Sequence, residues 1–249
     1  MPRYDLLSVA GLAVALVAVL LGQHLEGGSL SALFNGPAIL IVIGGSVGAT
    51  MLQSPLPIFV RAMRMLVWVV RPPHRDPQEL LREMVKWAQL ARREGLLGLE
   101  RVIGTVRDEY ARKGLQLVVD GNDPDIIRET LELDAMARER RDMHAARVLD
   151  GMGGYAPTLG ILGAVIGLIQ VMNNLADPAR LGQGIGVAFV ATVYGVGLAN
   201  LVFIPVGNKL KALVREESRL QEMTVVGILS IAAGDNPRVV ETRLQGLVV

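Results

Sequence analysis

The stretch that decides the fold is GMGGYAPTLGILGAVIGLIQVMNNLADPARLGQGIGVAFVATVYGVGLANLVFIPVGN, residues 151–208. It holds two apolar runs, 151–176 and 181–208, joined by the short polar turn Asp177-Pro178-Ala179-Arg180. Neither run contains Asp, Glu, Lys, Arg or His, and each exceeds the ~20 apolar residues that a helix needs to cross a bilayer. Both are rich in Gly and Ala, which let helix backbones approach closely. The sequence therefore predicts a membrane hairpin built for close packing rather than simple anchoring.

Two shorter apolar runs near the N-terminus, residues 6–22 and 38–52, predict a second membrane hairpin. Arg3 precedes the first run, so a cleaved signal peptide is the alternative interpretation. That run is long for the apolar region of a signal peptide, and Gly22-Gln23-His24-Leu25 is a poor cleavage site. Glycines in the second run indicate a face that packs closely against a neighbouring helix.

The region between the hairpins predicts a helical domain of different composition. After a proline-rich break, residues 58–70 are typical of a helix at the membrane surface, with Trp68 placed as an interfacial anchor. A linker follows, and Asp76-Pro77 then has the residue types of a helix N-cap and first helical position. We expect this helix to reach about Arg93.

Two further helical segments complete that domain, and a tail follows the second hairpin. Helical periodicity resumes over residues 96–113, and Asn122-Asp123-Pro124 starts a charge-rich helix that runs to Asp150. Residues 209–249 are amphipathic and predict two short helices, broken at Gly234-Asp235-Asn236-Pro237.

The distribution of basic residues gives the expected orientation. Of the 25 Lys and Arg residues, 17 lie between Arg61 and Arg147 and six between Lys209 and Arg243. Because basic residues are retained on the cytoplasmic side, the domain, the tail and both termini are expected in the cytoplasm. The predicted fold class is an all-α membrane protein with four transmembrane helices in two hairpins, a cytoplasmic helical domain between helices 2 and 3, and a cytoplasmic helical tail. The corresponding segments are 1–54, 55–150, 151–208 and 209–249.

Composition excludes several classes of function. Hydrophobic residues make up 51% of the chain and the mean hydropathy is +0.41, which favours the membrane class. The net charge of +1 argues against a nucleic-acid partner. There is no Cys, and the three His residues are far apart in sequence, so we expect neither thiol chemistry nor a metal site. No nucleotide loop or nucleophile–base pair indicates an enzyme.

The predicted membrane helices lack any acid or base near their middle, which a self-contained transporter normally carries. They are therefore either inert, or half of a site whose charged residue comes from another chain. The second reading is favoured by polar residues within or beside the last two helices, although each could satisfy only a local hydrogen bond. These residues are Thr158, Gln170, Asn173, Thr192, Tyr194 and Asn200.

Two prolines and one charged stretch add to this interpretation. Pro157 is expected to open the third membrane helix and Pro205 to lie in the last turns of the fourth, where proline permits a bend or merely marks a helix end. In the domain, Arg93 and Glu100 are seven residues apart and would share a helical face, unless Gly95 and its neighbours interrupt it. A solvated charged face is the alternative reading.

Six blocks of sequence, taken together, resemble the MotA/PomA family, the ring-forming subunit of the bacterial flagellar stator. The similarity covers nearly the whole chain and keeps the family's order. The blocks are Ile39–Ser46, Ala91–Glu100, Leu117–Asp123, Ala156–Ala164, Val187–Gly195 and Gly234–Val240.

The resemblance implies a homo-pentamer of this chain around two copies of a MotB-type partner, whose membrane helix carries the ion-binding Asp. It also implies that Arg92, Arg93 and Glu100 contact the rotor protein FliG. The family's two functional prolines correspond to Pro157 and Pro205, and its threonine on the fourth helix corresponds to Thr192. The implied location is the bacterial inner membrane, and no cofactor is implied.

Two departures from sodium-driven relatives concern the coupling ion. Those relatives have threonines where this chain has Ala164 and Ala191. Sodium needs several oxygen ligands in place of its water shell, whereas a proton needs an acceptor and a water chain. We therefore expect proton coupling rather than sodium coupling.

Two other function classes remain open on sequence alone. An ExbB/TolQ-type subunit uses similar ion-driven chemistry to energise an outer-membrane system, but that family usually has three membrane helices. A purely structural membrane scaffold is the third alternative. A co-purifying partner with a peptidoglycan-binding domain would favour the stator.

Overall fold

The computed structural model describes residues 5–73, 75–173 and 178–248, and within these ranges every regular element is helical. The chain divides into two compact units. The membrane unit comprises Met1–Pro72 and Asp142–Ala212, and the core unit comprises Pro73–Arg141 and Leu213–Val249. The two units are defined by the contacts between residues. The boundaries predicted at 54, 150 and 208 concern where the chain enters a membrane, so they stay predictions.

Among the described residues, four helical segments are long and apolar enough to cross a membrane, which confirms the predicted all-α membrane fold with a large helical region between the second and third spans. The first, α1 (Leu6–Leu25), buries none of its residues. The second is a continuous run of three elements, and the third and fourth begin within longer helical segments. The elements concerned are α2 (Gly36–Ile39), η2 (Leu40–Gly44), α3 (Gly45–Gln53), α9 (Pro124–Asn173) and α10 (Pro178–Leu198).

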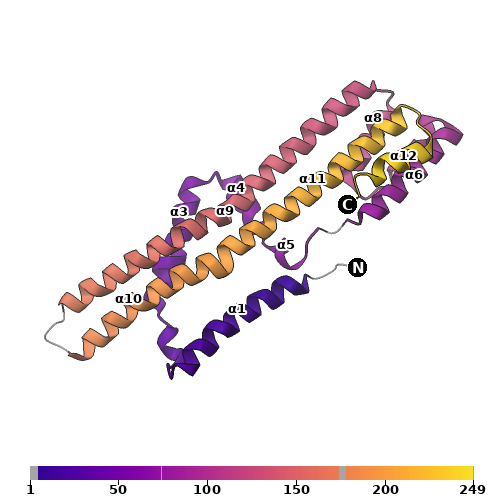
Figure 1. Ribbon diagram of the computed structural model, residues 1–249. Helices are drawn as coiled ribbons and strands as arrows, with labels where there is room; N and C mark the ends of the chain where they lie inside the picture. Colours follow the sequence, from indigo (N-terminus) through magenta and orange to yellow (C-terminus); the bar gives the residue numbers. More distant parts are fainter. Residues whose placement is uncertain (1–4, 74, 174–177, 249) are drawn as a thin grey trace. The chain divides into compact units, whose positions relative to one another are not determined.

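Helices α9 and α10 lie antiparallel and side by side in the membrane unit (Figure 1). The second span packs against them through small side chains, as its glycines predict. Leu159 of α9, for example, lies 3.0 Å from where a Cβ on Gly45 of α3 would be. The buried residues are mostly small: one cluster joins Ala38, Val190 and Ala191, and another joins Val42, Ala156 and Ala199.

The sequence predicts that the fourth membrane helix ends near Asn208, but in the structure it continues past this residue. Helix α10 passes through the π-helical segment η4 (Ala199–Phe203) directly into α11 (Ile204–Ala232), and Pro205 lies in the first turn of α11. A proline ring in a helix clashes with the carbonyl four residues earlier, here that of Leu201. The wider π turn is placed where it relieves this clash, so the helix continues.

Pro157 does not open a helix either, which corrects the second proline prediction. It lies inside α9, which is continuous from Pro124 to Asn173. The predicted end of this helix at Asp150 is likewise wrong, because the helix crosses the glycine-rich stretch without a break. Proline lacks an N–H group, so Pro157 leaves the carbonyl of Gly153 without its usual helical donor.

The predicted surface helix forms two short helices, α4 (Leu56–Met65) and α5 (Val67–Val70). Arg61 on α4 forms a bidentate ion pair with Asp142 on α9, at 2.7 and 2.9 Å. The Arg61 guanidinium also lies over the Trp68 ring, 5.1 Å from its centroid. Since the pair joins α4 to α9 within the membrane unit, Arg61 has a structural role in addition to its expected place at the membrane surface.

Side-chain caps start the helices of the core unit where the sequence places them. Asp76 caps α6 (Pro77–Glu94), and Asn236 caps α12 (Pro237–Gln245). Asp108 caps α8 (Glu109–Val119), a start that the sequence does not predict. Each accepts a hydrogen bond from a backbone N–H of the first turn, which would otherwise lack a partner. Gly234, at a φ of 72°, makes the predicted break before α12.

The periodic segment 96–113 is not one helix, which corrects that prediction. It divides into η3 (Leu96–Leu99), α7 (Glu100–Ile103) and the start of α8. The break falls at Val106, which is buried and whose carbonyl accepts two hydrogen bonds from the Arg112 guanidinium, at 2.7 and 3.1 Å. The Arg112 side chain therefore holds this turn in addition to the backbone hydrogen bonds that Thr105 and Val106 donate to the carbonyls three residues earlier.

One large apolar cluster forms the interior of the core unit. Tyr110 on α8 is 1% exposed, and its hydroxyl donates a 2.7 Å hydrogen bond to the Leu131 carbonyl. Burial raises the pKa of Tyr110 above its ordinary value, with the nearby Asp134 charge adding to it. Fully enclosed members of the cluster come from all the longer elements: Met84, Leu99, Leu115, Ile127, Leu131, Met223, Ile228, Ile231, Val240 and Leu244.

Candidate functional site

Glycines bring α9 and α10 into backbone contact along their facing surfaces. A Cβ on Gly160 would lie 2.8 Å from the Ala191 carbonyl oxygen, and one on Gly195 would lie 2.6 Å from the Ala156 carbonyl oxygen. A Cβ on Gly167 would lie 3.0 Å from the Gly184 carbonyl oxygen. Real Cβ atoms essentially never come within 3.0 Å of such an atom, so only glycine permits this helix spacing at Gly160 and Gly195, and a Cβ at Gly167 would require α10 to shift.

This contact brings together four of the five residues predicted for the ion path. Thr192 is half-buried and its Cα lies opposite Gly160, while Pro157 is half-buried with its Cα opposite Gly195. Ala191 is fully buried between the helices, and its Cβ faces Gly163. Ala164, half-buried, follows Gly163 on α9.

The fifth residue, Pro205, is exposed and is connected to the others through Gly153. Ile204, which immediately precedes Pro205, packs on Gly153 so closely that a Cβ there would lie 2.7 Å from the Ile204 Cγ1. Gly153 is also the residue whose carbonyl Pro157 leaves without a donor. The two prolines therefore affect the same contact between α9 and the start of α11.

Three of the six polar residues named for this hairpin make local hydrogen bonds, the alternative that the sequence leaves open. Thr158 donates to the Tyr155 carbonyl at 2.8 Å, Thr192 to the Ala188 carbonyl at 3.3 Å, and Asn200 to the Val196 carbonyl at 2.9 Å. A threonine bonded back to its own helix turn still has free acceptor capacity. Their predicted roles toward an ion stay predictions.

Tyr194 is the exception, because its bonds join distant parts of the chain. Its hydroxyl donates to the Leu33 carbonyl and accepts a 3.4 Å hydrogen bond from the Asn35 N–H. Both partners lie in the connection before the second membrane helix. Tyr194 thus anchors the connection between the first two membrane helices to α10, a contact that the sequence does not indicate because its residues are about 160 positions apart.

The predicted rotor-contact residues lie on two helices, on either side of a sharp turn. Arg92 and Arg93 end α6, whereas Glu100 begins α7. Gly95, with φ 75° and ψ 173°, separates them in a conformation that is essentially restricted to glycine. All three side chains are exposed, and no hydrogen bond or ion pair engages them in the described part of the chain. The shared helical face predicted for Arg93 and Glu100 is therefore interrupted.

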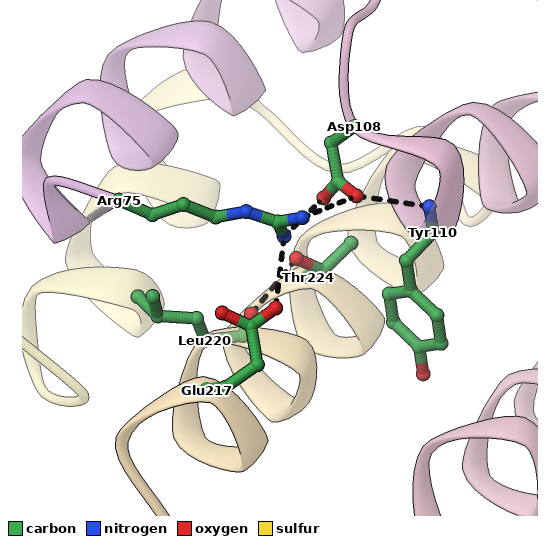
Figure 2. A network of polar contacts seen from close by, with 6 residues as sticks. All are labelled: Arg75, Asp108, Tyr110, Glu217, Leu220 and Thr224. Atoms are coloured by element: carbon green, nitrogen blue, oxygen red, sulfur yellow. Dashed lines mark hydrogen bonds and ion pairs between the residues drawn. The ribbon is translucent and has the colours of Figure 1, made fainter. Parts of the chain in front are cut away.

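A second charged network, absent from the sequence-based predictions, holds the linker to the core unit. Figure 2 shows the Arg75 guanidinium between Asp108 and Glu217. The contacts to Asp108 are 2.7 and 2.9 Å, and that to Glu217 is 3.4 Å. Because Asp108 also caps α8, one arginine ties the segment before α6 to the start of α8 and to the interior of α11. The sequence gives little indication of this network, because its three residues are far apart along the chain.

The described residues offer no group of three or more His, Asp or Glu side chains arranged to hold a metal ion. Charged pairs of the membrane unit instead join its helices: Asp5 pairs with Lys209, and Asp150 with Lys211 at 3.0 Å. The chemistry available between α9 and α10 is therefore that of hydroxyls, amides and backbone carbonyls.

Comparison with known proteins covers nearly the whole chain. A model described as "Motility protein A N-terminal" matches residues 9–95, and one for the "MotA/TolQ/ExbB proton channel family" matches residues 103–223. Motility protein A of Bacillus subtilis is 38% identical over 96% of this chain and 89% of its own length. The chain belongs to the motility protein A family. Chemotaxis protein PomA of Vibrio alginolyticus, another MotA-like relative, is 31% identical over 97% of this chain and 94% of its own length.

Solved structures agree with this assignment to the MotA family. The C. jejuni MotAB structure has a TM-score of 0.93 at 30% identity and covers 98% of this chain and 96% of its own. The flagellar MotAB stator complex of Bacillus subtilis has a TM-score of 0.87 at 38% identity, covering 97% and 96%. Because the N-terminal model and these relatives are motility proteins, the ExbB/TolQ alternative is not favoured.

Proposed function

We propose that this chain is the ring-forming subunit of a flagellar stator, which converts an ion gradient into torque on the rotor. The observation that supports this most strongly is the near full-length similarity to MotAB stator structures. The chain works as an ion-channel subunit in the inner membrane, with both termini in the cytoplasm. A homo-pentamer surrounds two copies of a MotB-type partner.

The partner supplies the acid that the membrane helices of this chain lack. An ion crossing a bilayer needs a charged or strongly polar site, and none of the four apolar runs carries a carboxylate near its middle. The close α9–α10 pair provides Thr192 as a hydroxyl toward the ion path. Pro157 and Pro205 allow the contact around Gly153 to change when the partner's carboxylate gains or loses its charge.

The coupling ion is the proton. Ala164 and Ala191 stand where sodium-driven relatives have hydroxyls, so a dehydrated sodium ion would find fewer oxygen ligands here. The burial of Ala191 against Gly163 supports this, because the tight contact leaves no room for a larger side chain without a shift of α9.

Torque passes through the exposed charges at the end of α6 and the start of α7. Arg92, Arg93 and Glu100 pair with opposite charges on the rotor protein FliG. No partner engages these three side chains within the described part of the chain, which supports the proposal because such charges are available to pair with another molecule.

The test is the swimming of cells that lack other stators and carry this chain with its partner. We expect swimming to continue when sodium is removed and to stop when a protonophore collapses the proton gradient. Unimpaired swimming under the protonophore, with sodium supplied, would overturn the proton assignment. Lack of swimming in every condition, with the complex present in the membrane, would contradict the stator function itself.

A further inference from the structure

The turn that carries the rotor-contact charges also exposes an apolar side chain. Leu96, Leu97 and Leu99 occupy the single 3₁₀ turn η3, in which residues three apart lie on one face. Leu96 and Leu99 therefore pack together into the core cluster, and Leu99 is fully buried. Leu97 points elsewhere and is 71% exposed. It contributes little to the fold in this position.

A small pocket lies next to this turn, between the end of α6 and the end of α11. It has a volume of about 220 Å³, and its apolar lining comes mainly from alanines, with Leu96 and Ile231. Gly95 and Gly234, both with positive φ, end the two helices at its edge. The pocket is larger than the ~150 Å³ cavity that takes up benzene, so it has room for one large apolar side chain.

The charges around the pocket indicate what chemistry can occupy it. Arg92 lines the pocket and is unpaired within the described residues, with Arg93 beside it in sequence. The carboxylate of Asp235, also in the lining, is already paired with Arg243 at 2.5 Å. The pocket is therefore apolar inside with a net positive rim. An apolar side chain next to an acidic one complements it.

We propose that the rotor partner binds this surface through an apolar centre surrounded by charge pairs. It places an apolar side chain in the pocket beside Arg92, presents a recess to Leu97, and offers acidic side chains to Arg92 and Arg93. Buried apolar anchors within a polar rim dominate the free energy of many interfaces, while rim charges mainly set orientation and association rate. This inference rests on the proposed rotor contact and adds its specificity determinants.

Binding of the purified full-length stator complex to the rotor protein FliG, measured over a range of salt concentrations, tests the proposal. Leu97→Ser removes the exposed apolar side chain of this turn, and Ala233→Leu narrows the pocket from an exposed position in its lining. We expect each to weaken binding about tenfold. The loss should not change with salt, whereas the loss caused by Arg92→Glu with Arg93→Glu should shrink as salt screens the charges.

Matched controls separate this effect from general damage. Leu133→Ser removes a leucine of similar exposure elsewhere on the core unit, and Ala233→Ser keeps the pocket open; both should bind like the wild type. Wild-type binding by Leu97→Ser and Ala233→Leu, with weak binding by the double charge variant, would overturn this inference alone. Wild-type binding by all three would also overturn the rotor contact. Loss of the ring in Leu97→Ser would assign the surface to a neighbouring copy and contradict the proposal.

Discussion

At the scale of single residues, Gly195 sets the distance between α9 and α10. Its missing side chain lets the helix backbone approach the Ala156 carbonyl and the Cα of Gly160, at positions where a Cβ would lie 2.6 and 3.0 Å away. Backbone atoms cannot move aside as a flexible side chain can. Any larger residue at this position must separate the helices along the whole hairpin.

Gly195→Ala should therefore lower the stability of the purified complex, by about 1–3 kcal/mol as for other overpacked sites. The measurement is the midpoint of thermal unfolding in detergent. Gly197→Ala is the matched control, because it makes the same change on the same helix at a position with open space around it. Equal midpoints for the two variants would contradict the assignment of Gly195 to the helix contact.

Asp134 in the core unit gives a prediction about pH. Burial raises its pKa, but the hydrogen bond and charge of Arg138, together with Lys113, outweigh burial and hold the pKa below its ordinary value. A lowered pKa in the folded state means that the carboxylate stabilises the fold at neutral pH. That contribution is lost as pH falls from the unfolded value, about 3.9, through the folded one.

We expect Asp134→Asn to destabilise the complex at pH 7 by up to about 1 kcal/mol, in the range of a partly exposed ion pair. The difference from wild type should shrink in thermal melts as pH is lowered below 4. A difference that stays constant down to acidic pH would show that the ion pair is not its origin.

At the scale of elements, the turn between α6 and α7 decides where the rotor-contact charges stand. Gly95 ends α6 in a backbone conformation that a residue with a Cβ adopts only under strain. Without this turn, α6 would continue and carry Glu100 to a different direction relative to Arg92. The turn itself is therefore part of the proposed contact surface.

Gly95→Ala should reduce swimming speed while the protein reaches the membrane in normal amounts. The strain costs about 1–3 kcal/mol and favours a longer α6, which moves Glu100. Gly104→Ala is the control, since Gly104 has ordinary helical φ and open space at its Cβ position. Normal swimming by Gly95→Ala would indicate that the relative placement of Arg92 and Glu100 is unimportant.

The sequence predicts helix starts much better than helix ends. The starts at Pro77, Pro124 and Pro237 are confirmed because each depends on a local cap and proline. The sequence does not predict that α9 continues through Pro157, or that α10 continues through η4 into α11. A proline in a helix interior is normally costly, and what offsets it here is packing between helices that are not neighbours in sequence.

The same limit applies to the candidate site. Thr192 and Pro157 could be noted from sequence as a polar residue and a proline in charge-free, glycine-rich runs, whereas Ala164 and Ala191 were indicated only by the resemblance to the MotA/PomA family. The pocket beside Arg92 could not, since its lining comes from two segments far apart in the chain. Leu97 is a leucine like Leu96 and Leu99, so its residue type does not indicate that it is exposed. Only the geometry of the 3₁₀ turn distinguishes it from these two neighbours.

At the scale of the whole molecule, the chain keeps its charges out of the middle of its membrane spans. The ion pairs of the membrane unit involve residues outside the apolar runs, among them Asp5 with Lys209 and Asp142 with Arg61. What remains between α9 and α10 is a close contact of small and weakly polar residues. Such a surface can position an ion but cannot bind it strongly alone.

The central claim is that this chain forms an acid-free half of the ion path and that the partner's Asp completes it. The most direct test is rotation of tethered cells that lack other stators and express this chain with its MotB-type partner, either intact or with the ion-binding Asp changed to Asn. The account predicts rotation with the intact partner and none with the Asn variant, while both complexes assemble in equal amounts. Rotation with the Asn variant would contradict it.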